Sequence, residues 1–108
     1  MHGKIGHGRP RAIAYSSMKA ALDSYTKNLA KDLAPAIIVN AVAPGKTLTP
    51  MWGELNKKEK KELAATQLMN RFILPEEIAE GIIFLIKNDA ICGEILTIDG
   101  GMSLKALG

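Results

Sequence analysis

Tyr15 and Lys19 are the two side chains of this sequence whose types and spacing could do chemistry. Residues four apart on a helix lie one above the other on the same face. A neighbouring ammonium favours the phenolate, so Lys19 is expected to lower the pKa of Tyr15 from its reference value of about 10. This pair predicts general acid–base catalysis. The alternative is structural, because a packed tyrosine beside a solvated lysine is common on helices.

The elements that must position this pair alternate between helix and strand. Apolar periodicity and turn residues predict, in order, a helix over residues 12–34, a strand over 36–43, helical pieces within 52–70, a helix from Pro75 to about Asn88 and a strand over 94–99. Pro35 ends the first helix, because proline cannot continue it. The first strand is apolar on both faces, as expected for a parallel strand covered on both sides.

This alternation is typical of an α/β fold with parallel crossovers. Two such strands alone leave backbone groups without neighbours, so the sequence predicts one incomplete domain over residues 1–108. We divide it into a loop (1–11), a helix, strand and following loop (12–50), a helical segment (51–72) and a carboxy-terminal helix and strand (73–108).

The composition excludes several classes of protein. The 108 residues, 47% apolar and 23% charged, suit one small globular domain and not a disordered chain. The single cysteine, Cys92, allows no intrachain disulfide and no cysteine-based zinc site. No apolar run is long enough for a membrane span, and no apolar secretory stretch follows Met1, so we expect a cytoplasmic protein. The net charge of +3 is modest and the main charge run mixes signs, so no nucleic-acid partner is expected.

The first eleven residues are rich in glycine and basic side chains. The spacing of Gly3, Gly6 and Gly8 suits a phosphate-binding loop only weakly, because such a loop should follow a strand. His2 and His7 have no cysteine or carboxylate nearby, so no metal site is expected. We interpret this segment as a polar surface loop.

Three blocks in order resemble the carboxy-terminal half of the short-chain dehydrogenase/reductase family. They are Tyr-x-x-x-Lys-Ala-Ala-Leu over residues 15–22, Val-Asn-x-Val-x-Pro-Gly over residues 39–45 and Ile-Asp-Gly-Gly over residues 98–101. The likeness runs from about Ala12 to Met102. It implies a partial Rossmann-like, doubly wound parallel sheet of which only the carboxy-terminal half is present.

The resemblance implies a role for each matching residue. Tyr15 is the general acid/base that protonates a carbonyl oxygen as hydride arrives, and Lys19 lowers its pKa and binds the nicotinamide ribose, so both also contact the cofactor. Pro44 and Gly45 form a turn that lies against the nicotinamide ring.

The resemblance places the rest of the cofactor loop at Thr47 and Thr49, which face the carboxamide and diphosphate. Thr49 is the better match for a hydroxyl contact, and Thr47 would act mainly through its backbone. Simpler alternatives stay open, since Thr49 could be a turn hydroxyl and Asn40 a backbone partner at a strand end. Residues 99–101 are expected to be structural.

The helical stretch over residues 52–72 matches the lid that covers the substrate, and Trp52 could belong either to its core or to the substrate contacts. The family's serine, about a dozen positions before the tyrosine, is not found; His2 occupies that neighbourhood.

The resemblance implies an NAD- or NADP-dependent oxidoreductase that acts on a small carbonyl or alcohol and assembles as a homo-oligomer, a dimer or tetramer. The family's nucleotide-binding half is not found in this sequence, so we expect a fragment with little activity alone. The alternative is a non-catalytic association module, built around the long first helix.

Overall fold

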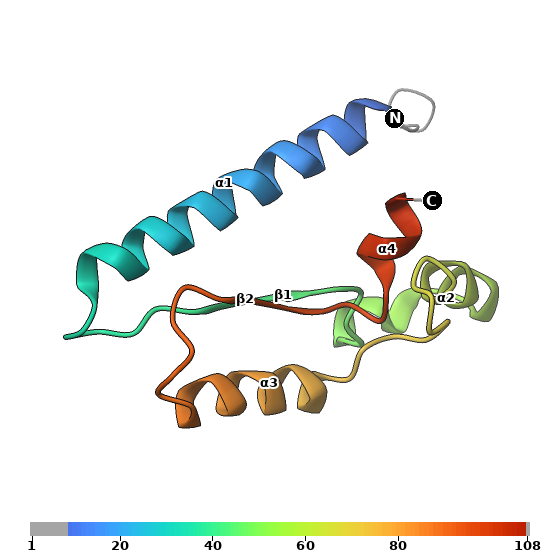
Figure 1. Cartoon of the computed structure of the whole chain (residues 1–108). Coiled ribbons are helices and arrows are strands. Elements are labelled where there is room, and N and C mark those ends of the chain that lie inside the picture. The colour runs from blue at the N-terminus through green and yellow to red at the C-terminus, as the bar shows by residue number, and fades with distance from the viewer. Residues whose placement is uncertain (1–8, 108) are drawn as a thin grey trace.

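The computed structural model describes residues 9–107 and shows an α/β arrangement (Figure 1). Its elements are the helices α1 (Arg9–Leu33), α2 (Lys57–Ala64), α3 (Pro75–Lys87) and α4 (Met102–Leu107), a short 3₁₀ helix η1 (Pro50–Glu54), and the strands β1 (Ala41–Pro44) and β2 (Ile95–Ile98). The predicted order of helix, strand, helical pieces, helix and strand is confirmed.

The two strands form a parallel sheet between two helical layers. β1 pairs with β2 in a register that runs from Ala41 opposite Ile95 to Pro44 opposite Ile98. In Figure 1 α1 lies on one side of the strands and α3 on the other. The fold class is therefore confirmed as α/β, a partial parallel sheet with helices on both sides of it.

The first helix begins earlier than its sequence pattern predicts. The prediction of a loop over residues 1–11 is wrong for Arg9 to Arg11, which are helical. Pro10 is compatible with this start, because the first turn of a helix does not need the N–H that proline lacks. The histidines and glycines of residues 1–8 lie outside the described residues.

The first strand is shorter than predicted, since residues 36–40 are not part of it. A strand extends only where a neighbour pairs with it, and β2 begins opposite Ala41. The Asn40 side chain instead links the segment before β1 to the segment before β2. Its Nδ2 donates to the Ile91 carbonyl at 3.0 Å, and its Oδ1 accepts from the Glu94 N–H at 2.9 Å. The interpretation of Asn40 as a backbone partner at a strand end is confirmed.

The segment over residues 51–72 contains two helical pieces, as predicted. α2 begins at a capping box in which the Glu59 N–H donates to Asn56 Oδ1 at 2.8 Å and the Asn56 N–H donates to Glu59 Oε1 at 3.0 Å. After α2 the chain returns toward the sheet, where Ile73 is buried.

The start of α3 is fixed by Pro75 and by a carboxylate. Glu77 accepts the N–H of Leu74 at 2.8 Å and forms a two-bond ion pair with Arg71 at 2.8 and 2.9 Å. The Arg71 hydrogen bond, followed by that of Leu74, lowers the pKa of Glu77 to about 2.

Much of the apolar surface of the helices is left uncovered. Of the apolar residues of α3, only Leu85 is buried, whereas Ile82 and Ile86 are 41% and 72% exposed. On α1, Ala30 is buried but Met18 is 73% exposed. The apolar face of α3 is therefore only partly buried, because a sheet of two short strands is too narrow to cover it.

No helix within the described residues is long and apolar enough to cross a membrane. The same residues contain no cluster of three or more histidine, cysteine or acidic side chains that could hold a metal ion.

The turn after β2 depends on glycine. Gly100 and Gly101 have φ values of +59° and +86°, and a Cβ on Gly101 would lie 2.8 Å from Leu68 Cβ. We expect Gly101→Ala to lower the free energy of unfolding by about 1–3 kcal/mol. The matched control is Gly53→Ala, where a Cβ meets no atom within 4 Å and the expected change is under about 0.5 kcal/mol. Urea unfolding measures both, and equal midpoints for the two variants would contradict this account.

Candidate functional site at the strand ends

The candidate site lies where β1 and β2 both end, at the carboxyl edge of the sheet. Ligands of open α/β sheets bind at this edge. We call the residues packed there the strand-end cluster, which comprises Gly45, Lys46, Gln67, Asp99 and Gly100. The segments that contribute to it are far apart in sequence, so the cluster exists only when the sheet and the segment after α2 are in place.

Gly45 continues the sheet by one hydrogen bond, since its N–H donates to the Ile98 carbonyl at 3.0 Å. A Cβ at this position would lie 2.8 Å from the Cα of Asp99 and would also collide with Gln67 Oε1. Real Cβ atoms do not approach backbone atoms so closely. Packing within the chain is thus a sufficient reason for glycine here, independent of any ring above it.

Gln67 holds the loop that follows β1, and the sequence analysis missed it. Only 1% of this residue is exposed. Its Oε1 accepts the N–H of Lys46 at 2.6 Å, and its Nε2 donates to the carbonyl of Arg71. Buried amides need such partners, so Gln67 ties the loop to the segment after α2. No local pattern marks Gln67 as buried, because α2 ends at Ala64 and its helical spacing does not extend to this residue.

Asp99 organises the other strand end and is 7% exposed. Its carboxylate accepts the N–H groups of Gly101 and Ser103, each at 3.0 Å, and the Ser103 hydroxyl at 2.6 Å. It therefore caps α4, and the prediction that residues 99–101 end the last strand is confirmed. Burial acts to raise the pKa of Asp99, but the hydrogen bonds from Ser103 and Gly101 and the charge of Lys19 outweigh it and lower the pKa.

Lys19 is half-buried, and its charge acts on Asp99 across the space between α1 and the sheet. This charge is the smallest of the influences on the pKa of Asp99, so it indicates proximity of Lys19 and no direct contact. Tyr15 lies in α1 one turn before Lys19, and its side chain is outside the described part of the structure.

The remaining predicted residues lie along the loop after β1. Pro44 is exposed at the last position of the strand. Thr47 is half-buried, its hydroxyl donates to the Gly45 carbonyl at 3.1 Å, and its backbone forms a parallel bridge with Ile73. Thr49 is exposed, directly before η1. The structure therefore gathers the loop residues at the carboxyl edge, with Thr49 the most accessible hydroxyl. The Trp52 side chain lies outside the described residues.

Helices on both sides of a parallel sheet are the arrangement of doubly wound α/β folds, which bind ligands at the carboxyl edge of the sheet. A family model described as enoyl-(acyl carrier protein) reductase matches residues 4–103. The chain belongs to the short-chain dehydrogenase/reductase family of oxidoreductases.

Individual relatives agree with this family assignment. The chain is 44% identical to the uncharacterized oxidoreductase YmfI of Bacillus subtilis, over 82% of this chain and 38% of that protein. It is 41% identical to the 3-oxoacyl-(acyl-carrier-protein) reductase FabG of Aquifex aeolicus, over 88% of this chain and 40% of that protein. A small-chain dehydrogenase solved in complex with NADPH superposes with a TM-score of 0.68 and 31% identity, over 85% of this chain and 42% of that one. The chain thus spans about two fifths of the length of these relatives.

Asp99 predicts how stability depends on pH. Its folded pKa lies below its unfolded pKa of about 3.9, so its contribution is complete above that value and is lost as the pH falls through the folded pKa. We expect Asp99→Asn to cost about 1 kcal/mol at neutral pH and less as the pH falls toward 3 and below.

The measurement is the urea midpoint across this pH range for the wild type and the variant. Asp32→Asn, at an exposed position of α1, is the control and should leave the wild-type pH dependence unchanged. A constant difference between wild type and Asp99→Asn at every pH would contradict this role of the carboxylate.

Proposed function

We propose that this chain supplies the catalytic helix and the nicotinamide-side loop of an NAD- or NADP-dependent oxidoreductase that interconverts a carbonyl and an alcohol. The observation that carries the proposal is the loop after β1, which Gly45 and Lys46 hold at the carboxyl edge of the parallel strands, in a chain that belongs to this family. Tyr15, one turn before Lys19 on α1, is the acid/base in this proposal.

The proposed chemistry divides into a hydride and a proton. A bound reduced nicotinamide supplies the hydride to the carbonyl carbon. Tyr15 donates its phenolic proton to the carbonyl oxygen, so the product is an alcohol and the residue is left as a phenolate. The ammonium of Lys19 stabilises that phenolate, and solvent returns the proton. Alcohol oxidation runs through the same steps in reverse.

The loop after β1 fits the nicotinamide end of such a cofactor. The absence of a Gly45 side chain lets the loop pack closely against Asp99 and Gln67, and exposed Pro44 beside it is accessible to a ring. The exposed hydroxyl of Thr49 is available to a carboxamide or phosphate oxygen, whereas Thr47 already donates to Gly45 and contributes its backbone. Lys19 would hold the ribose.

The substrate class follows from relatives that share this half of the fold. One is a 3-oxoacyl-(acyl-carrier-protein) reductase, and others are named carbonyl reductase family member 4. We therefore propose a small-molecule carbonyl or alcohol as the substrate, covered by the segment over residues 51–72, and a homo-oligomeric assembly.

Replacing Tyr15 by phenylalanine tests the acid/base. In an assembled oxidoreductase containing this chain, Tyr15→Phe should lower kcat by roughly 10²–10⁴-fold, the usual contribution of a positioned proton donor. Cofactor affinity should change little, because the ring is kept. The matched control is Tyr25→Phe on the same helix, which is 67% exposed and should retain activity. Retained turnover in Tyr15→Phe would remove Tyr15 from the mechanism.

The second candidate is a non-catalytic association module, favoured by the exposed apolar residues of α1, including Met18 at 73%. Sedimentation of an assembled protein containing this chain, with and without NADH or NADPH, separates the two candidates. We expect the 108-residue chain alone to show little turnover, since half-covered strands cannot hold a dinucleotide. Saturable cofactor binding supports the enzyme, whereas self-association without it supports the module.

A further inference from the structure

We propose that Gln67 is a positioning residue for the cofactor: its side-chain amide holds the corner formed by Gly45 and Lys46, in the loop after β1, where it receives the nicotinamide ring. This inference deepens the proposed function and rests on it. It gives the residue a measurable effect, which is to strengthen binding at the nicotinamide end of the cofactor and to leave the adenosine end unchanged.

The amide of Gln67 is fixed at both of its ends. Oε1 accepts the N–H of Lys46 at 2.6 Å, and Nε2 donates to the carbonyl of Arg71. The backbone of Gln67 is held as well, since its N–H donates to the Ala64 carbonyl at 3.2 Å and its carbonyl accepts from the Asn70 N–H at 2.8 Å. Because only 1% of the residue is exposed, water does not readily replace these partners.

The far end of this link is anchored on a helix. Arg71, whose carbonyl accepts from Gln67, forms the two-bond ion pair with Glu77 in the first turn of α3. Gln67 therefore connects the loop after β1 to the start of α3. A side chain fixed in this way can hold a binding loop in one position, because its own rotamer is locked by its partners.

The backbone hydrogen bonds of the loop lie on either side of the corner. The carbonyl of Lys46 accepts the Ile73 N–H at 2.9 Å, and the N–H of Leu48 donates to the Ile73 carbonyl at 2.8 Å. Before the corner, the N–H of Gly45 donates to β2 at 3.0 Å. Between these bonds, Gln67 ties the N–H of Lys46 to another segment. Loss of the amide should therefore loosen the corner and leave the sheet and the rest of the loop in place.

The corner is also where the proposed ring lies. Pro44 is exposed beside Gly45, and a Cβ on Gly45 would collide with Oε1 of Gln67. The amide oxygen thus occupies the space of a Gly45 side chain, so the position of that oxygen determines where the corner lies. In the proposed site the nicotinamide ring contacts this corner and the adenosine end of the cofactor does not.

Gln67→Met tests this role, because it keeps the length of the side chain and removes both of its hydrogen bonds. In an assembled oxidoreductase containing this chain, the Kd of NADH or NADPH should rise by roughly fivefold, the loss expected for about one net hydrogen bond. The Kd of ADP-ribose or of its 2′-phosphate should change by less than about twofold, because these ligands lack the nicotinamide. Calorimetry measures both affinities without any turnover.

The matched control is Thr66→Val in the same segment. The Thr66 hydroxyl donates to the Leu63 carbonyl at 2.6 Å, so this variant also removes a side-chain hydrogen bond, but one that stays within the segment. Both Kd values should stay within about twofold of those of the wild type. Circular dichroism verifies that each variant is folded.

Hydrogen exchange in the wild-type protein tests the same role if Gln67→Met does not fold. The Lys46 N–H exchanges when its bond to Gln67 opens, and a ligand that prefers the closed corner opposes that opening. Saturating NADH or NADPH should therefore slow this exchange by roughly fivefold, the same factor as the expected change in Kd, whereas ADP-ribose should leave it unchanged.

An unchanged Kd for the reduced cofactor in Gln67→Met would overturn the positioning role. An equal loss for ADP-ribose, an equal loss in Thr66→Val, or exchange at Lys46 that NADH and NADPH do not slow would overturn it as well. Failure of the proposed function looks different, since the wild type then binds neither NADH nor NADPH, and the role of Gln67 is lost with it.

Discussion

The parallel pairing of β1 with β2 is the interaction on which the rest of the structure depends. It joins segments whose flanking residues, Asn40 and Glu94, are 54 positions apart. Four residues of each strand take part, so side chains must reinforce the ladder at both ends. The Asn40 amide does so where the strands begin. Where they end, Gln67 holds the loop after β1 and Asp99 holds the turn after β2. The candidate site is thus also the point at which the sheet is fastened.

Local signals predicted the elements, but pairing decided their lengths. Pro35 and Pro75 bracket helices because of what proline does to its own backbone, and both boundaries were found from sequence. Residues 36–40 have strand-forming side chains and yet lie outside β1, because strand structure requires a neighbour. Ile37 and Ile38 of that segment are 54% and 44% exposed, so the described residues do not supply the cover on both faces that its apolar character predicts.

The residues of the candidate site also divide into those that the sequence predicts and those that tertiary packing decides. The family-like blocks singled out Lys19, Gly45 and Asp99. In the structure Gly45 packs against Asp99, and the charge of Lys19 contributes to the lowered pKa of Asp99. Gln67 escaped notice because its burial arises from the return of the segment after α2, which no local pattern encodes. The resemblance explained Gly45 by ring binding, but Asp99 and Gln67 already exclude a side chain at this position. Packing and ring binding can both require glycine at this position, because a residue without a side chain lets the loop lie close to the strand ends.

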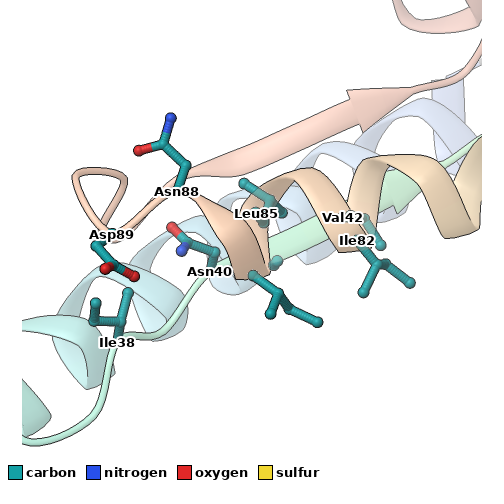
Figure 2. Close-up of a pocket in the computed structure, with 9 residues that line it drawn as sticks. Ile38, Asn40, Val42, Ile82, Leu85, Asn88 and Asp89 are labelled. Atoms are coloured by element: carbon teal, nitrogen blue, oxygen red, sulfur yellow. The ribbon is translucent and has the colours of Figure 1, made fainter.

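The free edge of β1 links the fold to the proposed chemistry. A ligand at the carboxyl edge of a parallel sheet lies across neighbouring strands, and β1 has such a neighbour on one side among the described residues. The loop from Gly45 to Thr49 thus forms one wall of a site whose opposite wall must follow the strand on the other side of β1. Whatever forms that wall lies beside Val42, close to the exposed apolar side chains of α3 such as Ile82 (Figure 2). The missing wall of the site and the missing apolar cover of the helices therefore lie on the same side of β1. Burial of the apolar surface and completion of the site depend on the same contacts.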